Sequence, residues 1–277
     1  MLRKAYLEIT NKCNLSCSFC HGTSRPAKFM TVEEFTHAAT ELRKVTEYLY
    51  FHLLGEPLLH PDLPKFLDIA DSLGFKVIIT TNGTLLQKRK RILLGAKCLH
   101  KVSVSLHSFE ANCAGCDPTE YLNGCFDFLN EASSRGIISV MRLWNIGGED
   151  KQNAEILSAM RKFFGSEWTE VRSGYRLKDK LFLEWGEKFE WPDENAECYS
   201  ECHTCYGLRD QVGVLSDGRV VPCCLDADGV ITLGNIFCES ITDILASPRA
   251  VALKRSFECR RITEPLCQKC DFATRLK

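Results

Sequence analysis

The sequence predicts an α/β protein, a partial (β/α)6 barrel followed by a small cysteine-rich region built of a β-hairpin and a helix. Strand-like apolar runs alternate with amphipathic helical runs over the first two thirds of the 277 residues, and cysteines become frequent in the last third. We expect strands at Ala5–Ile9, Tyr48–Leu54, Phe75–Thr80, Lys101–Leu106, Ile137–Leu143 and, more weakly, around Lys180–Glu184. We expect helices at Val32–Val45, Asp62–Leu73, Leu85–Leu94, Thr119–Arg135 and Asn153–Phe164.

Helix-end signals support this alternation. Thr31 precedes the first helix as an N-cap, and Glu33 and Glu34 lie in its first turn, where the helix dipole favours carboxylates. Gly74 follows the second helix as a stop signal. Strands that alternate with helices form a parallel sheet, and chemistry in such folds lies at the carboxyl ends of the strands.

Composition excludes several classes of partner. The chain has 35 basic and 36 acidic residues, a net charge of −1, so nothing favours nucleic acid or a membrane surface. Met1-Leu-Arg-Lys4 leads into a strand, so we expect no signal peptide and a cytoplasmic location. In that compartment the 16 cysteines indicate metal binding or redox chemistry better than disulfides.

Three cysteines directly follow the first strand. Cys13, Cys17 and Cys20 form a C-x3-C-x2-C run at the carboxyl edge of the predicted sheet. A closed iron–sulfur cluster takes four thiolates, so three cysteines leave one iron open to a ligand. Zinc sites usually show two ligand pairs, which this segment lacks, and scattered free thiols are the other alternative.

This run, with Phe19 just before its third cysteine, resembles the signature of the radical S-adenosylmethionine (SAM) superfamily. The resemblance implies a four-iron cluster whose open iron chelates SAM. One electron then cleaves SAM to a 5′-deoxyadenosyl radical that abstracts hydrogen. It also implies anaerobic chemistry and an electron donor such as flavodoxin or ferredoxin.

The ends of the next strands supply further candidates. Gly55-Glu56-Pro57 resembles the Gly-Gly-Glu-Pro motif that holds the SAM amino group, although Leu54 replaces the first glycine. By the same analogy Ser105 contacts the SAM ribose or carboxylate. His107 faces the barrel mouth either as a catalytic or as a structural residue. Arg142 is a clamp for the SAM carboxylate or for a substrate anion, or pairs with an acidic neighbour.

Two cysteines lie in the loop after the fourth strand. Cys113 and Cys116 sit on the catalytic side, where a thiol is a hydrogen-atom donor, a redox pair or incidental. We keep Cys116, with Arg142 and His107, as a weak catalytic candidate.

The last third holds a second cysteine set. Asp217-Gly218 predicts a hairpin turn between two β-rich runs, and a helix is expected from Ile241 onward. The layout resembles the auxiliary-cluster region of radical SAM enzymes, in its truncated twitch form rather than the full SPASM form. The resemblance implies that a second four-iron cluster is held by Cys205, Cys223, Cys267 and Cys270. Zinc is the alternative metal. Five further cysteines stay unassigned, among which Cys224 is a possible substitute ligand: Cys198, Cys202, Cys224, Cys238 and Cys259.

These patterns predict a barrel domain over residues 1–187 and a cluster domain over 188–277. They favour a radical SAM oxidoreductase with a dehydrogenase-like, small-molecule reaction, in which the auxiliary cluster accepts an electron. The chain starts its first strand at about residue 4, so a leader-peptide-binding domain is not expected in it. Two alternatives stay open: a peptide-modifying enzyme of the same superfamily, and a non-catalytic iron–sulfur electron carrier.

Overall fold

The computed structural model describes residues 1–113, 117–148 and 150–276. Its strands are β1 (Lys4–Leu7), β2 (Tyr48–Tyr50), β3 (Lys76–Thr81), β4 (Leu99–Ser105), β5 (Ile138–Ile146), β6 (Thr169–Val171), β7 (Gly174–Lys178), β8 (Leu181–Glu187), β9 (Gln211–Val214), β10 (Arg219–Val221) and β11 (Gly234–Asn235). Its helices are α1 (Val32–Arg43), η1 (Pro57–Leu59, 3-10), α2 (Leu63–Ser72), α3 (Leu86–Gly95), α4 (His107–Cys113), α5 (Thr119–Ser134), α6 (Asn153–Phe164), α7 (Ile241–Ala246), α8 (Pro248–Glu258), α9 (Pro265–Gln268) and α10 (Asp271–Thr274).

All the strands belong to a single open sheet. Its order is β11-β10-β9-β1-β2-β3-β4-β5-β8-β7-β6. The run from β9 to β8 is parallel, and the pairs at both ends of the sheet are antiparallel. The sheet does not close, which confirms the predicted partial barrel.

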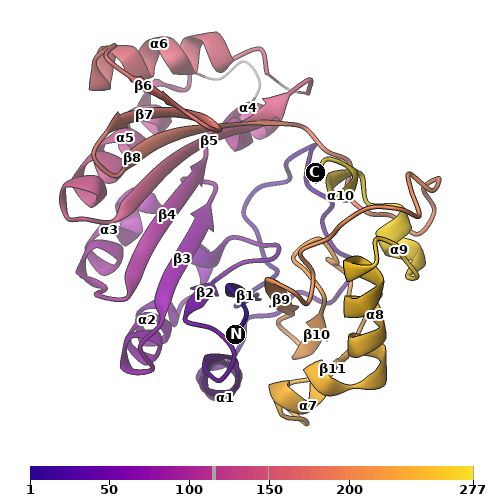
Figure 1. Cartoon of the computed structure of the whole chain (residues 1–277). Coiled ribbons are helices and arrows are strands. Elements are labelled where there is room, and N and C mark those ends of the chain that lie inside the picture. The colour runs from indigo at the N-terminus through magenta and orange to yellow at the C-terminus, as the bar shows by residue number, and fades with distance from the viewer. Residues whose placement is uncertain (114–116, 149, 277) are drawn as a thin grey trace.

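One face of the sheet is covered by helices. Figure 1 shows α2, α3 and α5 on the outer side of the strands, while the concave side is turned towards the C-terminal elements. Outward-facing strand residues such as Leu49, Val77 and Met141 are fully buried under these helices and form the main core. No described helix has the length and apolarity needed to cross a membrane.

Local chemistry explains the helix and turn positions. Thr31 accepts a hydrogen bond from Glu34 N at 3.1 Å and Glu34 accepts one from Thr31 N at 2.8 Å, so a reciprocal capping box begins α1. Gly218 turns the β9–β10 hairpin at φ +87°, as the Asp-Gly signal predicted. The helix predicted from Ile241 onward is two helices, because Ser247 ends α7 and, with Pro248, begins α8.

Two features of the strands differ from the sequence-based expectation. The predicted second strand ends at Tyr50 rather than Leu54, because the following residues turn towards the cysteine loop. The antiparallel β6–β7 hairpin between α6 and β8 was not predicted. Its short strands carry no sustained alternation, and β6 is exposed throughout.

Candidate functional site

The first cysteine set lies on the loop between β1 and α1, at the carboxyl edge of the parallel strands. Cys13 and Cys20 are exposed and Cys17 is half-buried, so all three thiols are accessible to a bound group. Cys20 N donates to Cys17 O at 3.0 Å, which folds the loop back on itself. Burial raises the pKa of Cys17 to about 11, with Cys20 and Cys13 near enough to add to the shift.

Side-chain amides from neighbouring elements contact these sulfurs. Asn112 of α4 donates from Nδ2 to Cys17 Sγ at 3.0 Å and accepts from Ser16 N at 2.8 Å. Asn82, which follows β3, points Nδ2 at Cys13 Sγ at 3.8 Å. The sequence singled out neither asparagine as a sulfur contact. Asn112 carried no signal at all, since α4 itself was not predicted.

Gly55 and Glu56 fix the second strand end against the cysteine loop. Gly55 has φ +74°, and a Cβ there would meet Thr10 O at 2.4 Å, so only glycine allows this approach. Glu56 N then donates to Lys12 O at 2.8 Å. Pro57, the last residue of the motif, is buried and begins η1.

The Glu56 side chain is buried at the junction of β2 and β3. Its Oε1 accepts from Leu58 N at 3.0 Å and from Thr81 Oγ1 at 2.7 Å. Its Oε2 accepts from Asn82 N at 2.8 Å and retains capacity for a further donor. Burial raises the pKa of Glu56 to about 7 against the opposing effect of these hydrogen bonds.

The structure brings Phe19 and His107 together. Their ring centroids are 4.7 Å apart, so the aromatic residue of the cysteine run packs over the start of α4. His107 Nδ1 lies 3.0 Å from Arg142 O, the contact of a positioned, structural imidazole. Burial lowers the pKa of His107 to about 4, so it is neutral near pH 7.

Ser105, Arg142 and Glu184 form one row across β4, β5 and β8, because these residues are register partners on the concave face.

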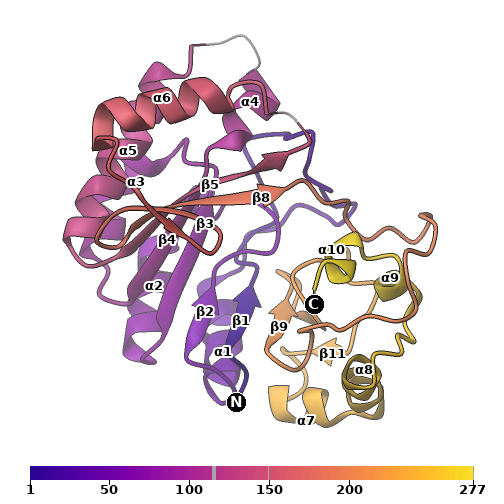
Figure 2. The same ribbon diagram turned by 45° about the horizontal axis from the view of Figure 1, so that its top comes forward.

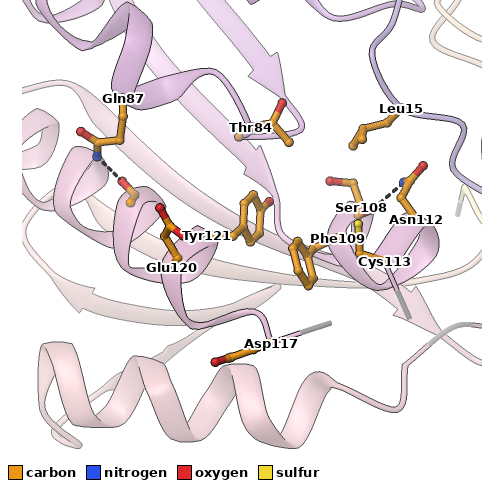
Figure 3. A pocket seen from close by; sticks show the side chains of 12 residues that line it. Leu15, Thr84, Gln87, Ser108, Phe109, Asn112, Cys113, Asp117, Glu120 and Tyr121 are labelled. Carbon is orange, nitrogen blue, oxygen red and sulfur yellow. Dashed lines mark hydrogen bonds between the residues drawn. The ribbon is translucent and has the colours of Figure 1, made fainter. Parts of the chain in front are cut away.

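Cys116 falls outside the described residues. Cys113 was expected in a loop but is the last residue of α4. It lines a pocket of about 430 Å³ beside the cysteine loop, together with Leu15, Phe109, Asn112 and Tyr121 (Figure 3).

The second cysteine set converges from separate segments. Cys205 precedes β9, Cys223 follows β10, Cys267 lies in α9 and Cys270 caps α10, and all four line one cavity. Burial raises the pKa of each thiol, that of Cys270 to about 12, so binding a metal centre would release protons. The hairpin and the two short helices thus place the residues that the motif resemblance indicated around one space.

The unassigned cysteines lie elsewhere. Cys224 does not line this cavity but packs with Tyr6, because the chain turns directly after β10. Four others are exposed: Cys198, Cys202, Cys238 and Cys259.

Among the described residues, no three His, Cys, Asp or Glu side chains gather closely enough for a single metal ion. The four thiols surround a cavity rather than a point, a donor set that fits a cluster.

Family models match both halves of this arrangement. Residues 7–160 match the Radical SAM superfamily, and residues 202–271 match SPASM, an iron-sulfur cluster-binding domain. Since the first match covers more than half of the chain, the protein belongs to the radical SAM superfamily. It is an enzyme of the group with a SPASM or twitch-like C-terminal region, and its cofactors are SAM, a SAM-binding four-iron cluster and an auxiliary iron–sulfur cluster.

Two curated relatives illustrate the similarity in sequence. The "AdoMet-dependent heme synthase" of Methanosarcina barkeri is 33% identical over 107 residues, which cover 38% of this chain and 31% of the relative. The chain therefore aligns with about a third of that relative. The "Probable GTP 3′,8-cyclase" of Methanosarcina mazei is 26% identical over 273 residues, covering 82% of this chain and 79% of the relative.

Solved structures share the fold. BtrN in complex with AdoMet and 2-DOIA superposes with a TM-score of 0.63 at 18% identity, covering 98% of this chain and 93% of BtrN. Streptococcus suis SuiB bound to S-adenosylmethionine gives 0.64 at 17% identity, covering 98% of this chain and 70% of SuiB. At these identities the likeness establishes the fold alone.

Proposed function

We propose that this enzyme oxidises a small-molecule substrate by hydrogen abstraction, as a dehydrogenase, with the auxiliary cluster as the electron acceptor. The observation that carries the proposal is the cavity lined by Cys205, Cys223, Cys267 and Cys270. Four protein thiolates would close the auxiliary cluster, which then has no open iron for substrate. A closed cluster beside the barrel suits electron transfer, and a substrate radical must lose an electron to complete an oxidation.

The first cluster is assigned to Cys13, Cys17 and Cys20. When bound, this cluster supplies the electron that cleaves SAM, and SAM supplies the radical that abstracts hydrogen. The chain's own residues orient these groups. Asn112 holds the Cys17 sulfur, and Glu56 offers the remaining capacity of its Oε2 to the SAM ammonium group.

Four further residues complete the proposed SAM site. Phe19 packs beside the cluster loop, Gly55 and Pro57 shape the turn that presents Glu56, and Ser105 ends β4 on the concave face. His107 is neutral and is hydrogen bonded to the backbone of Arg142, so it holds the start of α4 against β5 rather than exchanging protons.

The experiment is anaerobic reconstitution followed by iron and 5′-deoxyadenosine analysis. Two four-iron clusters predict about eight irons per chain, and the triple variant Cys13→Ala, Cys17→Ala and Cys20→Ala should keep about half. The double variant Cys267→Ala and Cys270→Ala should still form 5′-deoxyadenosine but fail to turn over substrate. Zinc at the second set, or normal turnover by the double variant, would contradict the acceptor role.

A peptide substrate is the second candidate. Two solved neighbours carry peptides, SuiB bound to precursor peptide SuiA and anSMEcpe with AdoMet and a Kp18Cys peptide. Competition between a peptide panel and small molecules for the SAM-loaded enzyme separates the two.

A reduced flavodoxin or ferredoxin is the proposed electron donor, and the cytoplasm is the proposed location.

A further inference from the structure

The concave face of the sheet is polar and reachable by solvent. Along β5, Met141 and Leu143 point outward and are fully buried under helices, whereas the alternating residues Arg142 and Trp144 face inward and are partly exposed. Figure 2 shows β5 and β8 side by side, with their inner surface turned towards the C-terminal elements. The inward residues therefore lie on the concave face, and the outward residues form the core.

Three buried nitrogen atoms on this face have no hydrogen-bond partner: Arg142 Nε, Trp144 Nε1 and His52 Nδ1. The Arg142 guanidinium carbon lies 3.6 Å from the Trp144 ring centroid, so the indole holds the guanidinium in one plane. A Cβ on Gly186 would meet the Trp144 ring at 2.8 Å, and this glycine therefore admits the indole against β8. The Arg142 and Trp144 nitrogens are donors, and buried donors without partners are costly.

The charged side chains on this face leave a positive excess. Glu184 is paired with Lys101 at 3.3 Å, and Glu8 is paired with Arg25 at 2.7 Å. Lys4 lies over the rings of Tyr6 and Tyr50 at 5.1 and 5.2 Å. Neither Lys4 nor Arg142 forms a salt bridge within the part of the chain that the structure describes, and the nearby Glu184 carboxylate is already paired with Lys101. Burial of an unpaired cation is unfavourable unless a ligand supplies the counter-charge.

We propose that Arg142 and Trp144 bind an oxyanion of the substrate, a carboxylate or a phosphate, on the concave face between the two clusters. This inference rests on the proposed function, which places the substrate in the barrel. A planar guanidinium and an indole N–H offer converging donors to such a group. His52 adds a neutral nitrogen, since burial lowers its pKa to about 3.

The position of Arg142 favours substrate over SAM. Its electrostatic neighbours are Glu184, Tyr6 and Cys224, and Cys224 adjoins the auxiliary ligand Cys223. Glu56, the proposed SAM ligand, is instead a neighbour of Cys13 in the first cluster loop. The guanidinium thus lies on the auxiliary side of the barrel.

The test measures anion binding to reconstituted, SAM-saturated enzyme by isothermal titration calorimetry at constant ionic strength. Malonate tests for a carboxylate site, and pyrophosphate tests for a phosphate site. The anion that binds with the lower dissociation constant identifies the substrate class. We expect Arg142→Gln to weaken that binding at least tenfold. Arg91→Gln, on the exposed surface of α3, is the matched control and should bind as wild type.

A second variant guards against misfolding. Trp144→Phe keeps an aromatic face under the guanidinium but removes the indole N–H together with the five-membered ring, so it should weaken binding several-fold. Arg142→Lys keeps the positive charge and should retain more affinity than Arg142→Gln. Equal anion binding by wild type and Arg142→Gln would overturn the proposal. A tenfold loss of SAM affinity in Arg142→Gln would also overturn it, by assigning the guanidinium to the SAM carboxylate.

A failure of the oxyanion site and a failure of the proposed function give different results. Formation of 5′-deoxyadenosine by the wild type reports on SAM cleavage, whereas calorimetry reports on the oxyanion site. Absent anion binding with intact SAM cleavage overturns the oxyanion site alone. Anion binding without any SAM cleavage overturns the proposed reaction instead.

Discussion

At the scale of single residues, the carboxylate of Glu56 joins the ends of β2 and β3. It receives hydrogen bonds from Leu58, Thr81 and Asn82, and through its neighbour Gly55 the same turn contacts the cysteine loop. A substitution that removes the carboxylate therefore alters the strand junction as well as any SAM contact. Glu56→Gln, which keeps the shape, is a more informative variant than Glu56→Ala.

Glu56 should also make stability depend on pH. Its folded pKa of about 7 exceeds the ordinary value of 4.5, so the folded state holds the proton more tightly than the unfolded chain. The contribution of Glu56 to the free energy of unfolding is fully present below pH 4.5 and is lost as the pH rises through 7. The total loss is about 3 kcal/mol.

Urea unfolding of cluster-free, reduced protein at pH 5 and pH 8 measures this loss. His52 and His107 also make stability depend on pH, and they do so equally in wild type and in Glu56→Gln. The quantity to compare is therefore the difference in unfolding free energy between the two proteins at each pH. The stability of the variant relative to wild type should rise between the two pH values. A constant difference would show that Glu56 stays ionised in the folded protein.

Asn112 should tune the first cluster if, as proposed, Cys17 is one of its ligands, because Asn112 donates to the Cys17 sulfur. A hydrogen bond to a ligating sulfur raises the cluster's reduction potential, and a net bond of about 1 kcal/mol corresponds to about 40 mV for one electron. We expect Asn112→Ala to lower the midpoint potential by that order, as measured by a redox titration followed by electron paramagnetic resonance. The exposed α5 residue Asn123, changed to Ala, should leave the potential unaltered.

At the scale of elements, the cysteine loop is tied to the C-terminal region. Arg25 forms a bidentate pair with Glu8 at 2.7 and 2.8 Å and donates from Nε to Ala227 O at 2.9 Å. Asp228 accepts from Thr23 Oγ1 at 2.5 Å and lies 3.4 Å from His21. Trp191 in the connector donates to Phe19 O at 3.0 Å. The loop that carries Cys13, Cys17 and Cys20 is thus held by the connector and by the segment that follows Cys223.

The Arg25–Glu8 pair should show strong coupling. Both side chains are almost fully buried, so Arg25→Met alone or Glu8→Gln alone leaves an uncompensated group and should cost about 3–5 kcal/mol in the free energy of unfolding. The double variant should be more stable than the sum of the single losses predicts. Denaturant unfolding of all four proteins gives the coupling energy, and additive losses would show that the two groups act separately.

At the scale of the whole molecule, the sheet runs through the predicted domain boundary. β9 from the C-terminal part pairs in parallel with β1, from Lys4↔Gln211 to Leu7↔Val214. The buried Glu8 carboxylate also accepts from Ser216 N at 3.0 Å. The division at residues 187 and 188 stays a prediction, and the shared sheet indicates that the two parts depend on each other for stability.

Hydrogen exchange tests that dependence. Amides of β1 and β9 should exchange with the same protection and disappear together in one unfolding transition, because each strand supplies hydrogen-bond partners to the other. The variant Cys267→Ala with Cys270→Ala should lower the protection of both strands by the same amount. Loss of protection in β9 while β1 stays protected would identify two independent units.

Much of the fold was open to prediction from sequence because it depends on local patterns. The capping box at Thr31, the Asp-Gly turn at residue 218 and the alternation of strands and helices each reflect interactions between residues close in the chain. The β6–β7 hairpin and α4 were not predicted, because their short segments carry little local preference and are placed by tertiary contacts. Asn112 was missed for the same reason.

By itself the sequence determined the class of chemistry, because the spacing of Cys13, Cys17 and Cys20 is a local property of one loop. Only the tertiary structure decided which cysteines of the C-terminal region share a cavity, since these residues lie far apart in the chain and meet through the β9–β10 hairpin and its packing. It also decided that Cys224 faces the barrel. It also decided the partners of Glu56 and Arg142. Burial and hydrogen bonding across strands set these environments, and neither is encoded in the identity of a single residue.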